Sequence, residues 1–253
     1  MSYVEVQNVS LDYPLVGLGA RSLKNRLLGA ATGGLISSGD SVPVIKALRD
    51  ITFSLKEGNR LGWIGHNGAG KSTLLKVLGG IYRPTSGSLI TAGKIVTTLN
   101  LSLGMEMEAT GIENIVIRGL LLGMKRKEIE KKIEEITAFT ELGEYLDMPV
   151  RIYSSGMVTR LAFATVTAIE SDILLMDEVI GTGDAAFIEK AEQRLNEFIN
   201  RSKIIVLASH SEDVIRKFCT HTLLLEQGKM VAIGANKEMF DLYRARSAEG
   251  VAA

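Results

Sequence analysis

The chain has 253 residues, and its 29 Lys and Arg side chains match its 29 Asp and Glu side chains, so its formal net charge is zero at pH 7. At roughly 150 residues per domain, this length indicates one large domain, or one domain with a small appendage, whose core needs no disulfide or metal. The charge balance argues against a general nucleic-acid-binding protein, which carries a strongly basic face or tail. With 46% hydrophobic and 23% charged residues, wholesale disorder is excluded.

A single cysteine, Cys219, cannot form an internal disulfide or a zinc site built from cysteines, and a reducing compartment fits this usage. The amino terminus carries Glu5 and Asp12 and does not have the basic-then-apolar order of a secretory signal. No stretch of the sequence approaches the ~20 apolar residues that a membrane-spanning helix needs. We therefore expect a protein that reaches a membrane only through a partner.

The amino-terminal part of the chain has the pattern of strands. Residues 3–9 alternate apolar and polar side chains, and residues 48–55 do the same before a Glu-Gly turn. Residues 61–64 form a short apolar run that enters a glycine-rich loop, and residues 72–78 after this loop are typical of a helix.

Almost forty residues separate the first two expected strands, far more than the ~4–6 residues of a usual connection. We expect an insertion at about residues 14–46. Within it, residues 21–29 (RSLKNRLLG) place leucines on one helical face and basic side chains elsewhere. Two interpretations stay open: a surface helix on a tolerated insertion, or a basic amphipathic helix that lies at a membrane surface or against a partner helix.

The carboxyl-terminal part alternates helices and strands. Residues 126–146 are typical of an amphipathic helical region, and the apolar runs at 173–176 and 204–208 are each preceded by helical sequence. Strands separated by helices indicate an α/β fold with a parallel sheet and crossover helices. A hairpin is expected around Gln227-Gly228, before a last helix near residues 237–246.

The segment GHNGAGKST at residues 65–73 matches the phosphate-loop pattern GxxxxGK(S/T), with a strand before it and a helix after it. Its glycines let backbone N–H groups turn inward around an anion, and the helix N-terminus adds partial positive charge. In such a loop, Lys71 neutralises the β- and γ-phosphates and the Ser72 hydroxyl ligates Mg²⁺. We therefore expect a bound nucleoside triphosphate at Gly65, His66, Asn67, Gly68, Ala69, Gly70, Lys71, Ser72 and Thr73.

Two carboxylates, Asp177 and Glu178, follow the apolar run at 173–176. A carboxylate at the end of a buried strand suits a magnesium ligand that acts through water, which we expect of Asp177. Its neighbour Glu178 is placed to orient and deprotonate the attacking water. Paired carboxylates also occur at ordinary loop starts, but the phosphate loop favours the catalytic interpretation. His210 follows another strand, where α/β sheets place ligands, and we expect it to contact the γ-phosphate.

A second loop, RIYSSGM at residues 151–157, begins the helical sequence MVTRLAFATVTAI. It resembles the signature loop of ABC ATPases, whose usual form is LSGGQ, with a serine and the second glycine kept and the other glycine and the glutamine replaced. The resemblance implies that this loop closes over the γ-phosphate that the other protomer of a dimer holds. The signature residues are Tyr153, Ser154, Ser155, Gly156 and Met157.

The YSSGM variant is similar to that of the ATP-binding subunits of bacterial polysaccharide exporters, which handle O-antigen, capsule and teichoic acid. The early insertion, the TGIEN segment at 110–114 and the DEVIGTGDAAF segment at 177–187 look like the same branch. The resemblance covers essentially the whole chain.

This resemblance implies one ABC ATPase domain over residues 1–253, with a RecA-like parallel-sheet core, an antiparallel β subdomain and a helical signature subdomain at about 98–165. It implies ATP and Mg²⁺ as cofactors, a head-to-tail homodimer in which residues 181–184 cross between protomers, and two membrane-spanning permease subunits. It further implies a peripheral position at the cytoplasmic face of the inner membrane, with no nucleic acid bound. Tyr13 lies where an aromatic side chain stacks on adenine in this family, although it could equally serve packing.

Members of the family carry a glutamine after the strand that follows the phosphate-loop helix. The glutamines of this chain lie elsewhere, at Gln7, Gln193 and Gln227. Asn100, Ser102 and Glu106 lie in the corresponding segment and are possible substitutes for this glutamine. We assign the role to none of the three.

The function that the sequence favours is ATP hydrolysis that drives export of a lipid-linked polysaccharide, with O-antigen as the favoured cargo. Because the chain ends about where the ATPase should end, we expect no carbohydrate-binding domain after it and cargo recognition by the permease. One alternative is an exporter with another cargo, such as teichoic acid, capsule, a drug or a lipoprotein. A second is a non-transport ABC ATPase of repair or translation, which the single phosphate loop and the zero net charge disfavour.

Overall fold

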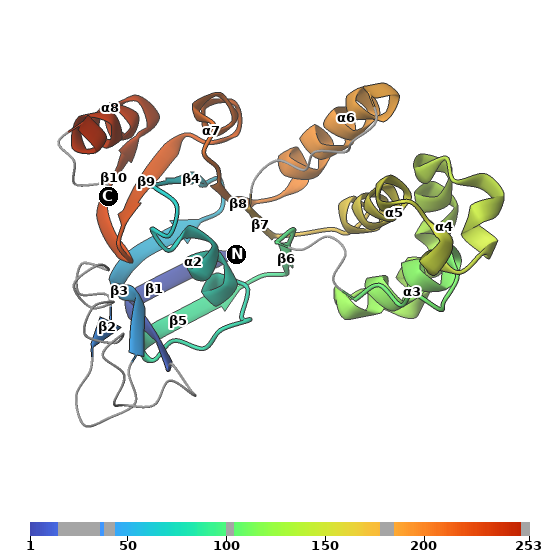
Figure 1. Cartoon of the computed structure of the whole chain (residues 1–253), viewed down its shortest axis with the longest axis horizontal. Helices are drawn as coiled ribbons and strands as arrows, with labels where there is room; N and C mark the ends of the chain where they lie inside the picture. Colours follow the sequence, from blue (N-terminus) through green and yellow to red (C-terminus); the bar gives the residue numbers. More distant parts are fainter. Residues whose placement is uncertain (15–35, 38–43, 100–103, 178–184, 249–253) are drawn as a thin grey trace, which may run out of the picture. The chain divides into compact units, whose positions relative to one another are not determined.

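The computed structural model describes residues 1–14, 36–37, 44–99, 104–177 and 185–248. The chain divides into two compact units (Figure 1). Unit 1 comprises residues 1–93, 176–178 and 204–253, and unit 2 comprises residues 94–175 and 179–203. Unit 1 contains the phosphate loop, and unit 2 contains the signature loop. Unit 2 is larger than the helical subdomain that the sequence places at about 98–165.

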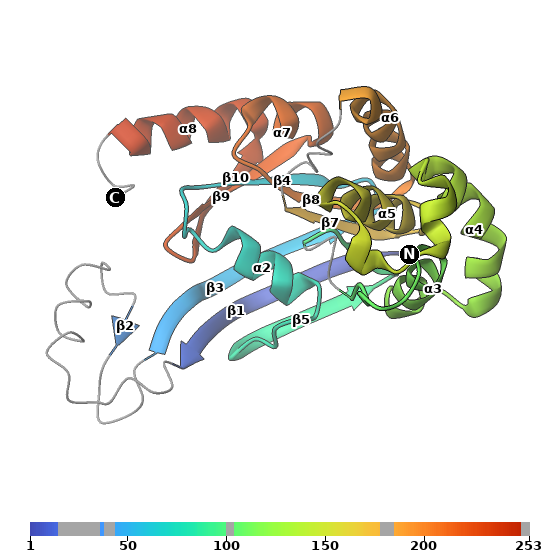
Figure 2. The ribbon, with the colours of Figure 1, turned by 45° about the vertical axis from the view of Figure 1, so that its right-hand side comes forward.

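Unit 1 contains an antiparallel sheet with the strand order β2-β3-β1-β5 (Figure 2). Its strands are β1 (Tyr3–Pro14), β2 (Ile36–Ser37), β3 (Val44–Lys56) and β5 (Ser86–Ala92). The first strand continues beyond the residues 3–9 that alternate, because Asn8 has a positive φ of 48° and shifts the register. Val9 and Leu11 then return to the buried face.

The expected insertion lies between β1 and β3. Its residues 36–37 form β2, which pairs antiparallel with the start of β3. Residues 15–35 and 38–43, including the expected basic helix at 21–29, lie outside the described residues.

The second sheet of unit 1 has the strand order β10-β9-β4-β8. Strand β4 (Arg60–Ile64) pairs in parallel with β8 (Ile204–Ala208) and with β9 (His221–Glu226), whereas β10 (Lys229–Ala235) is antiparallel to β9. Every residue of β8 is buried, as its uninterrupted apolar sequence predicts. The α/β class with a parallel sheet is therefore confirmed.

Helix α2 (Lys71–Leu78) follows β4 after the phosphate loop and contacts β8 of the parallel sheet and β3 of the antiparallel sheet (Figures 1 and 2). Two further helices, α7 (Glu212–Phe218) and α8 (Asn236–Ala248), complete unit 1.

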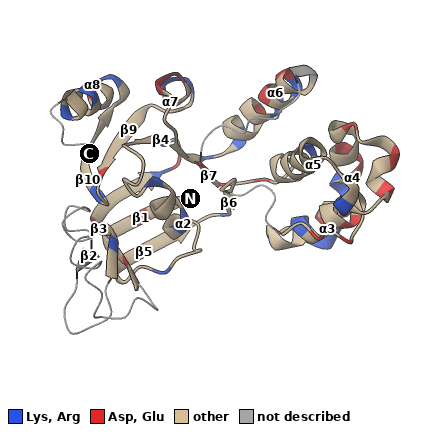
Figure 3. Ribbon diagram, in the orientation of Figure 1, with Lys and Arg blue, Asp and Glu red and all other residues tan. Residues whose placement is uncertain are grey.

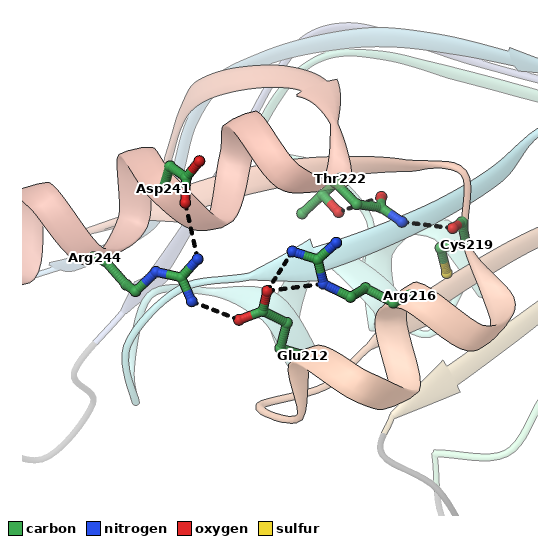
Figure 4. Close-up of polar contacts among 7 residues, drawn as sticks. Glu212, Arg216, Cys219, Thr222, Asp241 and Arg244 are labelled. Atoms are coloured by element: carbon green, nitrogen blue, oxygen red, sulfur yellow. Dashed lines mark hydrogen bonds and ion pairs between the residues drawn. The ribbon is translucent and has the colours of Figure 1, made fainter.

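Ion pairs and hydrogen bonds join α7 to α8 (Figure 4). The carboxylate of Glu212 accepts hydrogen bonds from Arg216 and Arg244, and Arg244 also donates to Asp241. The hydrogen bond from Arg216 is the main reason that the pKa of Glu212 lies below its ordinary value. Nearby, burial raises the pKa of the Cys219 thiol to about 12, so this cysteine is a neutral packing residue.

Unit 2 pairs β6 (Ile95–Thr97) in parallel with the first residues of β7 (Ile173–Asp177). Its helices are α3 (Gly111–Leu121), α4 (Arg126–Thr140), α5 (Ser155–Thr167) and α6 (Ala185–Arg201), with short 3₁₀ helices at Gly143–Asp147 and Val150–Ile152. The amphipathic region expected at 126–146 is split, because Glu141 adopts a left-handed φ of 56° and ends α4. Charges of both signs lie along α4 (Figure 3), as in the Arg126–Glu130 pair.

Helix α3 has no counterpart among the helices expected from the sequence. Thr110 caps it: its hydroxyl accepts from the Glu113 N–H, and the Glu113 carboxylate accepts from the Thr110 N–H. This is a capping box, and its T-x-x-E pattern is visible in the sequence. Asn114 is fully buried, accepts from the Glu106 N–H, and donates to the carbonyls of Glu106, Ala109 and Thr110. One amide therefore fixes the turn before α3.

We expect Asn114→Ala to lower the free energy of unfolding by about 2–4 kcal/mol, because four hydrogen bonds of this buried amide to the backbone of residues 106, 109 and 110 are lost. Urea unfolding followed by circular dichroism measures this loss. Asn200→Ala, at an exposed position of α6, is the matched control and should change stability by less than about 0.5 kcal/mol. Equal stability of the two variants would show that the buried amide network contributes nothing.

Candidate functional site

The phosphate loop leaves β4 in a conformation that only glycine adopts without strain. Gly65, Gly68 and Gly70 have φ values of 149°, 82° and 107°. A Cβ at Gly65 would lie 2.2 Å from the Leu225 carbonyl oxygen, and one at Gly70 would lie 3.1 Å from the Ala47 oxygen. All three positions therefore need glycine for their backbone conformation, and Gly65 and Gly70 need it for close packing as well.

The hairpin between β9 and β10 supports this loop. Gln227 and Gly228 have φ values of 45° and 77°, as a type I′ turn requires. The Gly228 N–H donates to the Ala69 carbonyl at 2.9 Å, and its own carbonyl accepts from the Arg49 N–H at 2.7 Å. The expected hairpin is therefore present, and its turn joins the phosphate loop to β3.

The first turn of α2 offers an environment suited to an anion. Gly70 is the N-cap residue without a side-chain cap, and the first turn has no acidic residue. The Lys71 side chain is buried, and its ammonium donates to the carbonyls of Gly65 at 2.6 Å and of His66 at 3.1 Å. Ser72 is exposed. The positive end of the α2 dipole, the Lys71 ammonium and the exposed Ser72 hydroxyl together suit the binding of a phosphate group.

The rim of the loop is polar and exposed. The His66 ring nitrogen Nδ1 lies 2.7 Å from the Asn67 carbonyl oxygen. Asn67 and Gly68 are exposed, whereas Ala69 is buried. These residues shape the loop, and the buried alanine anchors it.

The carboxyl ends of neighbouring strands meet at this loop. Because β4 and β8 are parallel, with Trp63 opposite Ala208, the phosphate loop and His210 emerge at the same edge. Ser209 is buried and donates its N–H to the Trp63 carbonyl, which leaves His210 exposed after it. Asp177, at the end of β7, also belongs to unit 1.

Oxygen ligands of the kind that Mg²⁺ prefers are present at this edge in Ser72 and Asp177. Within the described residues, no group of three or more His, Cys, Asp or Glu side chains could hold a metal by itself. Glu178 and residues 181–184 lie outside the described residues.

Tyr13 lies next to the phosphate-loop helix. Its side chain hydrogen-bonds with Thr73 of α2, so two residues assigned from separate parts of the sequence come together. Burial raises the pKa of Tyr13 above its ordinary value, and the bond with Thr73 opposes this rise. Tyr82, which the sequence did not single out, packs edge-to-face on Tyr13 with ring centroids 5.4 Å apart.

In unit 2, the signature loop begins α5. The Ser154 hydroxyl caps the helix by accepting from the Met157 N–H at 3.3 Å. Ser154, Ser155 and Gly156 are all exposed. Tyr153 differs from them, because it is buried and its hydroxyl donates to the Tyr145 carbonyl. The tyrosine therefore anchors the loop, and the three residues after it are presented to the outside.

The segment in which the family carries a glutamine is described only in part. Asn100 and Ser102 lie outside the described residues. Glu106 is exposed, and its carboxylate accepts from the Glu108 N–H at 3.3 Å. Its backbone is held by Asn114, so this residue also serves the turn before α3.

A sequence profile of the ABC transporter family matches residues 48–181, which include the phosphate loop and the signature loop. The chain belongs to the ABC transporter family. It is an ATPase of this family, as the resemblance of its motifs implied.

Two curated relatives indicate the branch of the family to which this chain is similar. The chain is 46% identical over 229 residues to the O-antigen export system ATP-binding protein RfbE of Yersinia enterocolitica, covering 90% of this chain and 96% of that protein. It is 34% identical over 240 residues to the teichoic acids export ATP-binding protein TagH of Staphylococcus haemolyticus, covering 95% and 87%. The branch indicated by the YSSGM loop is thereby confirmed.

Solved structures agree on the fold. The dimeric post-hydrolysis state of the ATP-binding cassette MJ0796, bound to ADP and Pi, matches with a TM-score of 0.66 at 22% identity. The match covers 92% of this chain and 98% of that one. Among the described residues of this ABC cassette, no helix has the length and apolar character to span a membrane.

Proposed function

We propose that this ABC ATPase is the ATP-hydrolysing subunit of an exporter that moves a lipid-linked polysaccharide, with O-antigen as the favoured cargo. The identity of 46% to an O-antigen export ATP-binding protein, over nearly the full length of both chains, is the observation that carries this assignment. Two copies would pair with two membrane-spanning permease subunits at the cytoplasmic face of the inner membrane. The permease would contact the polymer.

The reaction is attack of water on the γ-phosphate of ATP. The ammonium of Lys71, held at the loop by two carbonyls, would donate to the phosphate oxygens that gain charge in the transition state. Magnesium would supply further positive charge to the phosphates, with Ser72 and, through water, Asp177 as its protein ligands. Glu178 would accept a proton from the attacking water, and His210 would contact the γ-phosphate.

Contacts to the adenine base and from the partner protomer would complete the site. Tyr13 would stack on adenine, at a place fixed relative to the phosphate loop by its bond with Thr73. The exposed Ser154 and the start of α5 would bind the γ-phosphate held by the other protomer, as an N-terminal anion site does.

Gly156 supports this trans role. Within the described residues, a Cβ at Gly156 would meet only the Ser154 hydroxyl oxygen, at 3.9 Å. Internal packing therefore does not require glycine at this position, although glycine in a helix costs up to about 1 kcal/mol relative to alanine. Close approach of a ligand or a second chain to this backbone does give a reason for glycine.

Deletion of the gene tests the cargo. We expect a surface polysaccharide to disappear from the cell exterior and its lipid-linked form to accumulate inside. The wild-type gene should restore export, and Lys71→Ala should not. Accumulation of a teichoic acid would replace O-antigen as the cargo, whereas an unchanged surface and no intracellular polymer would contradict the export assignment.

A further inference from the structure

Tyr82 lies in the segment that joins α2 to β5, and it touches the residue proposed to stack on adenine. Its ring packs edge-to-face on Tyr13, with an interplanar angle of 81°. A hydrogen bond between the two phenol side chains accompanies this ring contact. Tyr13 therefore has two side-chain partners, Thr73 on α2 and Tyr82 after α2.

The backbone around Tyr82 is tied at both ends. The Tyr82 N–H donates to the Lys76 carbonyl at 3.2 Å, which holds it to the last turn of α2. Three residues later, the Thr85 N–H donates to the Ser10 carbonyl at 2.8 Å, and the Thr85 hydroxyl accepts from the Asp12 N–H at 2.9 Å. The segment thus connects the helix of the phosphate loop to the strand that carries Tyr13.

The ring of Tyr82 is also held on its own account. The Lys76 ammonium lies 5.6 Å from the centroid of this ring, within the range of a cation–π contact. Tyr82 is half-buried, so its ring is partly shielded while it contacts Tyr13. Because the Lys76 contact holds the Tyr82 ring, this ring restricts the orientations open to the Tyr13 ring that packs against it.

We propose that Tyr82 is a positioning residue for the nucleotide base: it fixes the Tyr13 ring, at a set place relative to the phosphate loop, in the orientation that stacks on adenine. This inference rests on the proposed function, because it assumes that Tyr13 stacks on the base. Tyr82 acts through Tyr13 and leaves the phosphates to the loop. Its effect is therefore confined to ligands that carry a base.

Two ligands separate base binding from phosphate binding: ATP, and inorganic tripolyphosphate, each with Mg²⁺ and the full chain. We expect Tyr82→Leu to weaken ATP binding by about 3- to 10-fold, since the ring contact is lost. The affinity for tripolyphosphate should not change. Tyr82→Phe, which keeps the ring, should bind ATP within about twofold of wild type. In steady-state hydrolysis, Tyr82→Leu should raise KM for ATP and leave kcat unchanged.

Tyr243→Leu on α8 is the matched control, because it removes a half-buried tyrosine of the same unit. It should bind both ligands as wild type does. Equal weakening of ATP and tripolyphosphate by Tyr82→Leu, or no weakening of ATP, would overturn the positioning role. Lys71→Ala tests the proposed function separately from the positioning role of Tyr82. If this variant keeps wild-type affinity for both ligands, the phosphate loop does not bind the nucleotide, and this result does not depend on the Tyr82 variants.

Discussion

Glu178→Gln is expected to bind ATP and to form the nucleotide-sandwiched dimer, yet to lose hydrolysis by about 10²–10⁴-fold. The amide keeps the size of the side chain and its hydrogen bond to water, but it does not accept a proton near neutral pH. ATP would then stay intact between the protomers. Phosphate release measures turnover, and size-exclusion chromatography with and without ATP measures the dimer.

Glu170→Gln is the matched control for this variant. Glu170 is exposed and precedes β7, on the amino-terminal side of the strand that ends at Asp177. It should hydrolyse ATP at the wild-type rate. Near-normal hydrolysis by Glu178→Gln would refute the role of general base, and loss of ATP binding would indicate a ligand role for this carboxylate instead.

The sequence predicted those parts of the fold whose determinants are local. The apolar runs of β7 and β8 lie where they were expected, because a strand buried on both faces needs apolar residues throughout. The phosphate loop could also be predicted from the sequence, since its glycines stand at positions with a positive φ. The turn at Gln227 and Gly228 could be predicted for the same reason, because its two residues also have a positive φ.

Contacts between distant residues were beyond the sequence pattern. Tyr13 and Tyr82 are 69 positions apart (82 − 13), and no periodicity links them. The alternation of apolar and polar residues predicts β1 only as far as Val9, because the positive φ of Asn8 shifts which residues face the core. Helix α3 is not predicted from the sequence, although Thr110 and Glu113 form a visible capping box. Its buried positions have helical spacing, but among them stand the polar residues Asn114 and Arg118, so an apolar pattern does not mark this face.

The division of the site between two chains was also outside the reach of composition and spacing. Family resemblance alone implied it, and the structure contributes the exposed start of α5 and the unconstrained Gly156. Because each composite site would draw its phosphate loop from one protomer and its signature loop from the other, two different defects should complement in a mixed dimer.

A mixture of Lys71→Ala and Gly156→Asp chains is therefore expected to regain ATPase activity that neither variant has alone. Each homodimer carries the same defect in both of its sites. In a mixed dimer, one site combines both defects, while the other joins an intact phosphate loop to an intact signature loop. With random pairing, half of the dimers are mixed and each has one good site, so activity should reach roughly a quarter of the wild-type value.

Phosphate release from an equimolar mixture measures this recovery, with each variant alone as the baseline. A mixture of Lys71→Ala with Asp177→Ala chains is the control, because both defects then lie on the phosphate-loop side and every dimer keeps two damaged sites. Differently tagged chains, captured in tandem, verify that mixed dimers form. If they form and the first mixture is no more active than the control mixture, the signature loop does not complete the site of its partner, and ATP hydrolysis is a property of each chain alone.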